Sequence, residues 1–252
     1  YIFYRGQDFP QTNISVNVGL LGSDFEIIGN RYRISKIYPG DLYYWNEWSP
    51  LSIHPIEEGD YIISVNGIPI TADRSIYSYF ENLADREVII EVSKDISGKD
   101  TAEYKVRPVS SEYYLRYIDW VYTNRKYVEE KSGGTIGYIH IPDMSGFGLV
   151  QFFRQFYNQL DKDGLIIDDR YNGGGNVSQI ILEKLRRELS YLSVSRHTIP
   201  RTSPRNVFLG HLVCLINEDA GSDGDLFPEA FRMYGLGELI GTKTCLLYTS
   251  DA

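Results

Sequence analysis

Two short apolar runs in this sequence each lead into a polar segment punctuated by glycine. The run 164–167 precedes Asp169–Gly175, which closes with three consecutive glycines, and the run 212–216 precedes Asn217–Asp225. Apolar runs of this length are typical of strands buried on both faces, as in an α/β sheet covered by helices. Ligand sites of such sheets lie at the carboxyl ends of the strands. We therefore expect the two polar segments to meet at one edge of a sheet and to form a site there.

The second half of the chain alternates between patterns typical of strands and of helices. Strands are predicted at 135–141, 165–168, 212–216 and 238–240, and helices at 148–160, 177–189 and 222–234. Alternation of this kind indicates a mainly parallel sheet with helices packed on it. The fold class predicted for this half is α/β.

The first half, from 19 to 108, reads instead as a small β-rich domain. Strands are predicted at 32–37 and 88–92, and a helix at 75–83. Between them, Gly59–Gly67 predicts a turn, a strand and an Asn-Gly turn. This pattern, with the loop Gly19, Leu20, Leu21 and Gly22, resembles a PDZ domain.

In a PDZ domain that loop receives the terminal carboxylate of a peptide, which adds as a strand to an exposed sheet edge. Gly19, Leu20, Leu21 and Gly22 are therefore the predicted peptide-binding residues. The alternative is that the domain only packs on its neighbour, because a fold does not by itself establish a ligand.

The chain is predicted to hold a single connector between its two domains. A long helix is expected over 111–131. Its aromatic stripe is interpreted as core packing and includes Tyr114, Leu115, Ile118, Val121 and Tyr122. The predicted organisation is 1–18 as the end of a preceding catalytic subdomain or a linker, 19–108 PDZ-like, 109–134 connector, 135–244 core, and 245–252 a non-native tail. That tail resembles the translation of a transposase sequencing adaptor, and the whole chain is expected to be a fragment.

Composition excludes several classes of function. The 252 residues carry a net charge of −9, and scattered Lys and Arg argue against a nucleic-acid surface. No apolar run approaches the roughly 18 residues that a membrane span needs. Cys214 and Cys245 have neither disulfide-framework nor zinc spacing, and no metal or cofactor is predicted.

Ser222 is the candidate nucleophile. It stands where a strand is predicted to turn into a helix, a position that exposes a hydroxyl beside the positive end of the helix dipole. Gly221 lets the backbone bend there, and the amides of Asp223 and Gly175 are placed to stabilise an oxyanion.

Other interpretations of these residues remain open at this point. The Gly-Ser-Asp tripeptide alone favours Ser222 as simply the N-cap of the following helix. The triple glycine lacks the Gly-Lys-Ser/Thr of a phosphate loop, and the carboxylates Glu218, Asp219, Asp223 and Asp225 lack the spacing of an EF-hand, so they are interpreted as solvated or capping groups. None of the histidines, at 54, 140, 197 and 211, carries the signature of a general base.

Several strings across the chain resemble the tricorn-type branch of the S41 serine peptidases. They are Gly137–Pro142, Gly164–Gly175, Val177–Gln179, Asn217–Phe227, Gly235–Gly237 and Ile240–Thr242. The resemblance implies a ClpP/crotonase-like core, Ser222 as nucleophile, and the amides of Gly175 and Asp223 as the oxyanion hole. It also implies peptide substrates, a homo-oligomer (a hexamer in the archetype) and a cytoplasmic location.

The sequence also departs from that family. The family's Ser-His pair would lie upstream of Tyr1 and its distal glutamate beyond Thr244, so the chain itself is expected to be inactive. The lysine of the related Ser-Lys peptidases would also lie further on, and Lys243 is interpreted as structural. Ser193 falls where the archetype has an acid that favours basic side chains, which argues against a trypsin-like preference. The rival functions are a PDZ-like peptide-binding module with a vestigial core and a crotonase-like acyl-CoA enzyme.

Overall fold

The computed structural model describes residues 16–41, 47–197 and 199–245. Contacts between Cα atoms divide the chain into two compact units, 1–120 and 121–252. This division falls within the helix that was predicted as the connector. Each unit buries a hydrophobic cluster of its own. No helix among the described residues is long and apolar enough to cross a membrane.

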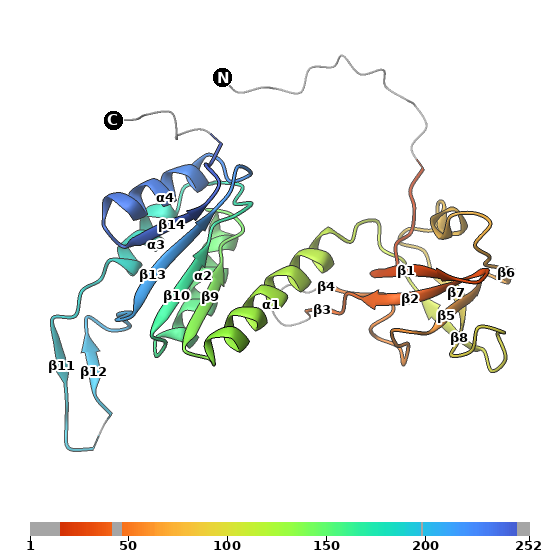
Figure 1. The fold of residues 1–252 in the computed structure, drawn as a ribbon, viewed down its shortest axis with the longest axis horizontal. Coiled ribbons are helices and arrows are strands. Elements are labelled where there is room, and N and C mark those ends of the chain that lie inside the picture. Colours follow the sequence, from red (N-terminus) through yellow and green to blue (C-terminus); the bar gives the residue numbers. More distant parts are fainter. Residues whose placement is uncertain (1–15, 42–46, 198, 246–252) are drawn as a thin grey trace, which may run out of the picture. The chain divides into compact units, whose positions relative to one another are not determined.

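The first unit is built on an antiparallel sheet with the strand order β1-β2-β5-β7-β8 (Figure 1). Two shorter strands form a separate ladder beside it. The bounds are β1 Ser23–Ile28, β2 Arg31–Ile37, β3 Gly40–Asp41, β4 Glu47–Trp48, β5 Tyr61–Val65, β6 Ile68–Pro69, β7 Val88–Ser93 and β8 Ala102–Val106. Because β1 is an edge strand of the described sheet, one side of it faces no other strand.

The Asn-Gly turn predicted after β5 is confirmed. Asn66 and Gly67 have φ values of 48° and 76°, the left-handed conformation that a tight two-residue hairpin requires. This turn pairs β5 with β6.

The helix predicted over 75–83 is wrong in type and length. Only a 3₁₀ helix, η1 Ile76–Phe80, forms there. Glu81 is already extended and Asn82 has a φ of 59°, so the backbone leaves the helical region before a second turn can close. Ile76 and Phe80 are still buried, as the pattern predicted.

The long helix α1, Tyr113–Ser132, is confirmed, but its aromatic residues are not its core. Leu115, Ile118 and Val121 are buried, whereas Tyr114 is 50% exposed. The interpretation of the stripe as core packing is therefore confirmed for Leu115, Ile118 and Val121 and wrong for Tyr114. Aliphatic side chains fill the buried face of this helix.

The second unit is an α/β layer whose four-stranded sheet has the order β14-β13-β10-β9, with every neighbouring pair parallel (Figure 1). The predicted parallel α/β sheet is thus confirmed. Its strands are β9 Ile136–His140, β10 Gly164–Asp168, β13 His211–Ile216 and β14 Gly237–Gly241. Its helices are α2 Gly146–Phe156, with the short η2 Tyr157–Gln159, α3 Ser178–Leu185 and α4 Asp223–Met233.

A hairpin that the sequence patterns missed follows α3. The helix predicted to run to 189 ends at Leu185, and β11 Tyr191–Ser193 pairs with β12 Arg201–Ser203. Figure 1 shows this hairpin extending away from the sheet of its unit. Tyr191 and Leu192 are 62% and 56% exposed, so burial within the unit does not hold the hairpin in place.

The core of the second unit is rich in phenylalanine. Helix α2 buries Phe152 and Phe156, and α4 buries Phe227 and Phe231, in one cluster with residues of the sheet. The rings of Phe152 and Phe156 stack with their centroids 5.1 Å apart. This cluster fixes both helices on the sheet and thereby places the amino end of α4.

Replacing Phe156 with alanine is expected to destabilise the second unit by about 3–5 kcal/mol, because a fully buried ring leaves a cavity. Urea unfolding followed by far-UV circular dichroism measures the change. Val150→Ala is the matched control, since Val150 lies on the same helix with 46% of its surface exposed and should cost less than about 0.5 kcal/mol. Equal losses for the two variants would contradict this account of the core.

Candidate active site

The two glycine-punctuated segments meet at the carboxyl ends of the neighbouring strands β10 and β13. The Tyr171 amide donates to Asn217 Oδ1 at 2.9 Å, and the Gly221 amide donates to the Asn172 carbonyl at 3.1 Å. A Cβ at Gly174 would lie only 2.6 Å from the Cβ of Ser222. The structure thus brings the triple glycine and Ser222 into direct contact.

Ser222 occupies a sharp turn between β13 and α4. Its φ of 58° and ψ of −123° lie in a region that residues other than glycine rarely adopt. A strained serine at a strand-to-helix turn is the geometry that exposes a nucleophile in α/β hydrolases. Ser222 is indeed exposed.

The alternative role of Ser222, as a helix cap, receives no support from its side chain. Ser222 stands at the N-cap position of α4, but its hydroxyl makes no capping hydrogen bond. A serine selected for capping would accept from the second or third amide of the helix. The hydroxyl is therefore left for other chemistry.

Among the three glycines, the amides divide into two that are used and one that is not. The Gly173 amide donates to the Pro142 carbonyl at 3.2 Å, and the Gly174 amide donates to Asn172 Oδ1 at 2.8 Å. The Gly175 amide donates to no acceptor in the described part of the chain, and the same holds for the amide of Asp223. Gly175 is also exposed. Each of the two glycine-punctuated segments thus contains one backbone amide without an acceptor, that of Gly175 and that of Asp223.

Gly175 has no room for a side chain. Its φ is 154°, and a Cβ would lie 1.9 Å from the carbonyl oxygen of Met144, which accepts from the Asn176 and Val177 amides. Because glycine has no side chain, the backbone at Gly175 can lie directly against Met144, and the Gly175 amide stays unobstructed.

The carboxylate of Asp223 ties α4 to α3. It accepts from the Ser178 amide at 3.0 Å and from the Ser178 hydroxyl at 2.6 Å, both buried. Asp223 thereby caps α3, whose own N-cap, Val177, has no side chain for this purpose. This contact fixes the first residue of α4 and hence the direction of its amide.

The interpretation of the neighbouring acids as solvated or capping groups holds for Glu218 and Asp219, which are solvated, and for Asp223, which caps α3. Glu218 and Asp219 are exposed. Asp223 and Asp225 are buried, with 6% and 1% of their surfaces exposed. The first turn of α4 lies against the loop that carries the triple glycine, since a Cβ at Gly224 would be 2.9 Å from the Asn172 carbonyl oxygen. No group of three potential metal-ligating side chains occurs in the described residues.

Asp169 lies beneath this loop, fully buried, and its pKa is raised well above the usual value of 3.8 because burial disfavours the charged form. Its Oδ1 accepts from Asn172 Nδ2 at 2.9 Å. The preceding Asp168 is instead paired with Arg170, whose Nη2 lies 2.6 Å from Oδ2. The two adjacent buried acids thus have different partners, a guanidinium for Asp168 and a neutral amide for Asp169.

The histidines of the second unit are not placed as a general base for Ser222. His140 is buried, its Nε2 is 2.8 Å from the Arg170 carbonyl, and burial lowers its pKa. His211 begins β13, whereas Ser222 follows the other end of that strand. His197 lies in the turn of the exposed hairpin. No described histidine hydrogen-bonds to Ser222.

The cysteines take no part in the site. Cys214 is a free thiol buried in β13, and burial raises its pKa well above the usual value. Cys245 is exposed, and its amide donates to the Ala220 carbonyl at 3.1 Å. The rest of the predicted tail, 246–252, lies outside the described residues.

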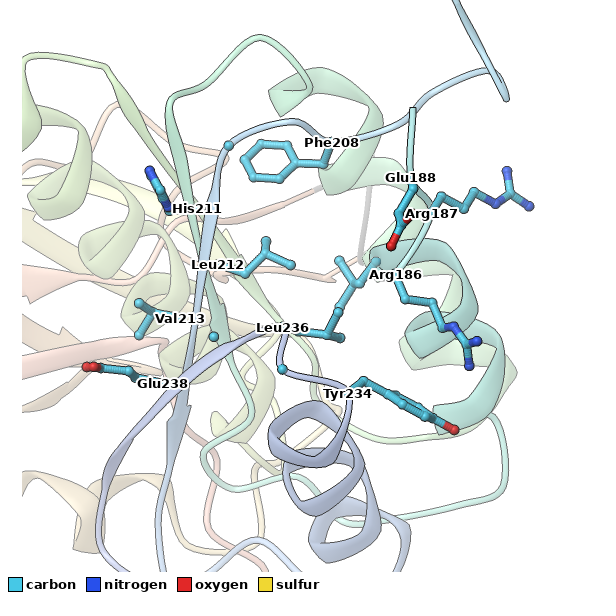
Figure 2. Close-up of a pocket in the computed structure, with 14 residues that line it drawn as sticks. Arg186, Arg187, Glu188, Phe208, His211, Leu212, Val213, Tyr234, Leu236 and Glu238 are labelled. Carbon is cyan, nitrogen blue, oxygen red and sulfur yellow. The ribbon is translucent and has the colours of Figure 1, made fainter. Parts of the chain in front are cut away.

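Two hollows open on the second unit. The larger, of about 910 Å³, lies at the amino ends of β13 and β14, where Arg186 stacks on the Tyr234 ring at 4.6 Å (Figure 2). It is therefore at the end of the sheet away from Ser222. The smaller, of about 380 Å³, lies between α3 and α4 and is lined by Ser178, Asp223 and Leu226. The smaller hollow thus adjoins the start of α4.

The predicted peptide-binding loop of the first unit makes hydrogen bonds within that unit. The Gly19 amide donates to the Phe80 carbonyl at 2.9 Å, and the Leu20 amide donates to the Val109 carbonyl at 2.8 Å. The Gly22 amide donates to the side chain of Glu112 at 2.7 Å. Leu21 is buried.

Comparison with known proteins agrees with this architecture. Residues 19–111 match the tricorn protease PDZ domain, and residues 135–246 match peptidase family S41. A PDZ-like antiparallel sheet followed by a parallel α/β core thus defines the class of protein. The chain belongs to peptidase family S41, in the branch that carries a tricorn-type PDZ domain.

Several individual proteins similar to this chain are tricorn proteases or their homologs. The chain is 40% identical to the tricorn protease of Thermoplasma acidophilum over 228 residues, which are 90% of this chain and 21% of the relative. It is 39% identical to a tricorn protease homolog of Saccharolobus solfataricus, over 91% of this chain and 21% of that protein. A crystal structure of the tricorn protease superposes with a TM-score of 0.82 at 39% identity, covering 90% of this chain and 22% of the other. The chain thus spans about a fifth of the length of these relatives.

Asp169 predicts a pH dependence of stability. A carboxyl group with a raised pKa in the folded state stabilises fully below its unfolded pKa, and this stability is lost as pH rises through the folded pKa. We expect Asp169→Asn, which mimics the neutral form, to gain stability over the wild type as pH rises above about 4, by up to about 1.4 kcal/mol per pH unit.

Urea unfolding of both proteins across this pH range measures the difference. Asp161→Asn, at an exposed position of the same unit, is the control and should track the wild type. A difference between Asp169→Asn and wild type that does not change with pH would show that Asp169 is ionised in the folded state.

Proposed function

We propose that this chain carries the nucleophile and oxyanion hole of a serine peptidase that forms an acyl-enzyme on Ser222. The observation that carries the proposal is an exposed serine in a strained strand-to-helix turn, with its hydroxyl uncapped. The unengaged amides of Gly175 and Asp223 supply the second element of such a site. Membership of the S41 family supports the same reaction.

In the proposed reaction, Ser222 Oγ attacks the carbonyl carbon of a peptide bond. The carbonyl oxygen becomes negative and accepts hydrogen bonds from the amides of Gly175 and Asp223, beside the positive end of the α4 dipole. The tetrahedral intermediate then expels the amine, which takes up a proton, and leaves an ester on Ser222. Water hydrolyses that ester to release the acid and restore the hydroxyl.

This sequence of steps needs a base to accept the proton of the serine hydroxyl. No described histidine contacts Ser222, so the chain by itself is expected to react slowly. Serine is a weak nucleophile at neutral pH without such a partner. The full peptidase activity is therefore proposed for a longer protein that brings a base to this site.

We propose that the smaller hollow, the groove between α3 and α4, accepts a side chain of the substrate. Leu226 and Met233 line it and are 52% and 75% exposed, and Asp223 lies at its end. The charged side chains of Glu183, Arg186 and Glu229 line it as well. The hairpin residues 191–203 contain no acid, and Ser193 pairs with Arg201, so nothing there favours a basic side chain.

The two rival functions have less support. A peptide-binding module with a vestigial core would not need a strained, exposed serine. A crotonase-like acyl-CoA enzyme shares the oxyanion geometry, but it does not account for the PDZ match at 19–111. We propose a PDZ-like domain at 19–108 and a peptidase core at 135–244, as the sequence predicted. We also propose a cytoplasmic location, which the family resemblance supports.

A fluorophosphonate probe tests the role of Ser222. We expect slow covalent labelling of the chain at Ser222, mapped by mass spectrometry, with a rate that increases with pH because hydroxide replaces the missing base. Ser222→Ala should abolish the label. Gly175→Ala keeps the backbone amide, but its Cβ would lie 1.9 Å from the Met144 carbonyl oxygen, so the loop and the amide must move out of place. A misplaced oxyanion donor should slow labelling by about 10²–10³-fold.

Ser190→Ala, at an exposed serine outside the site, is the matched control and should label at the wild-type rate. Labelling that survives in Ser222→Ala would refute the assignment of the nucleophile. Labelling of the wild type as fast as that of a complete serine hydrolase would refute the need for an external base.

The proposal includes self-association, which exposed apolar residues of the β11–β12 hairpin support. Leu192 and Val194 are 56% and 69% exposed. We expect the chain to form a homo-oligomer and the double variant Leu192→Glu, Val194→Glu to weaken it at least about tenfold, because charges cannot be buried unpaired at an interface.

Light scattering coupled to size-exclusion chromatography measures the mass of each protein. Ile53→Glu, at an equally exposed position of the other unit, is the control and should keep the wild-type mass. A wild-type chain that stays monomeric at high concentration would contradict self-association.

A further inference from the structure

The loop at the start of β1 holds a carboxylate of its own chain. The amides of Gly22 and Ser23 both donate to Glu112 Oε1, at 2.7 and 3.3 Å. Glu112 is 7% exposed and lies 90 residues from Gly22 in the sequence. Its other oxygen, Oε2, accepts from Arg116 Nε at 2.9 Å and Nη2 at 2.7 Å.

This arrangement is how proteins bind a free carboxylate. Consecutive backbone amides converge on one oxygen, and a guanidinium binds the other through two hydrogen bonds. Glu112 immediately precedes α1, yet its side chain points to the loop and to Arg116 and does not cap its own helix. Its role is therefore that of a ligand to the loop.

Arg116 is itself held in place by the unit. Its Nη2 donates to Asp24 Oδ1 at 2.8 Å and its Nη1 donates to the Tyr38 hydroxyl at 2.9 Å. The Tyr38 hydroxyl donates in turn to Asp24 Oδ2 at 2.6 Å. The cation thus stays at the loop through contacts that do not involve Glu112.

The position of this loop next to the sheet indicates which other ligand could bind its amides. The loop immediately precedes β1, which is an edge strand of the described sheet. A peptide added antiparallel to β1 would end at this loop, with its terminal carboxylate at the amides of Gly22 and Ser23. Glu112 occupies that point.

We propose that Glu112 is a built-in ligand that closes the carboxylate site of the PDZ-like unit, and that a peptide with a free C-terminal carboxylate binds there only when the Glu112 side chain is displaced. The inference is independent of the role of Ser222, because all of its residues lie within 1–120. It also accounts for a PDZ match without an open receptor loop.

The first test uses the whole chain with Glu112→Ala and acetate as the probe. The variant should lose roughly 10 °C in Tm, because buried amides and Arg116 lose their acceptor. Sodium acetate at about 0.1 M should restore part of that loss relative to sodium chloride at equal ionic strength, since a ligand that binds only the folded state stabilises it.

The wild type and Glu130→Ala, at an exposed glutamate of the same helix, should show no acetate-specific shift. If Glu112→Ala is unfolded in chloride, acetate should restore its circular dichroism spectrum. Absence of any acetate-specific recovery, in the folded or the unfolded case, overturns the assignment of a carboxylate site.

The second test compares a hexapeptide ending in valine, with a free carboxylate or a C-terminal amide, by calorimetry in the buffer where Glu112→Ala is folded. The variant should bind the free acid at least about tenfold more tightly than the amide, which lacks the charge that Arg116 pairs. The wild type should bind neither form. Carboxylate-dependent binding by the wild type, or equal affinities for acid and amide in the variant, overturns the closure by Glu112.

Discussion

The candidate site depends on the hydrogen bonds of one buried side chain, Asn172. Its Nδ2 donates to the Ile141 carbonyl at 3.1 Å and to Asp169, and its Oδ1 accepts from the Gly174 amide. Its backbone carbonyl accepts from Gly221. One residue thus joins the end of β9, the floor of the loop, the triple glycine and the turn before Ser222. A buried amide that uses its groups so fully is rigid, because each loosened contact would leave an unsatisfied polar group.

Close backbone packing then decides which amides remain for a substrate. Gly174 lies against Ser222 with no room for a Cβ. Gly175 likewise lies so close to the Met144 carbonyl that it has no room for a Cβ. The amides of Gly173 and Gly174 are consumed in holding the loop, and only that of Gly175 is left over. The position of a donor is therefore a consequence of packing that glycine alone permits.

The sequence predicted the parts of this arrangement that local pattern determines. The apolar runs identified β10 and β13, and the rule for parallel sheets placed their polar continuations together at one edge. It failed where long-range contacts decide. The helix expected at 75–83 ends early where Glu81 bridges Val18 and the Asn82 amide donates to the Asn17 carbonyl. The helical pattern also overran the hairpin β11–β12. The burial of Asp223 was also missed, because its partner Ser178 is 45 residues away.

The two units present the same chemistry, backbone amides beside a glycine, with opposite outcomes. In the first unit the amide of Gly22 is reached by Glu112, whose charge Arg116 balances. In the second unit, two buried carboxylates near the amides are engaged elsewhere, since Asp223 binds Ser178 and Asp169 accepts from Asn172. The amides of Gly175 and Asp223 are thereby left without an acceptor among the described residues.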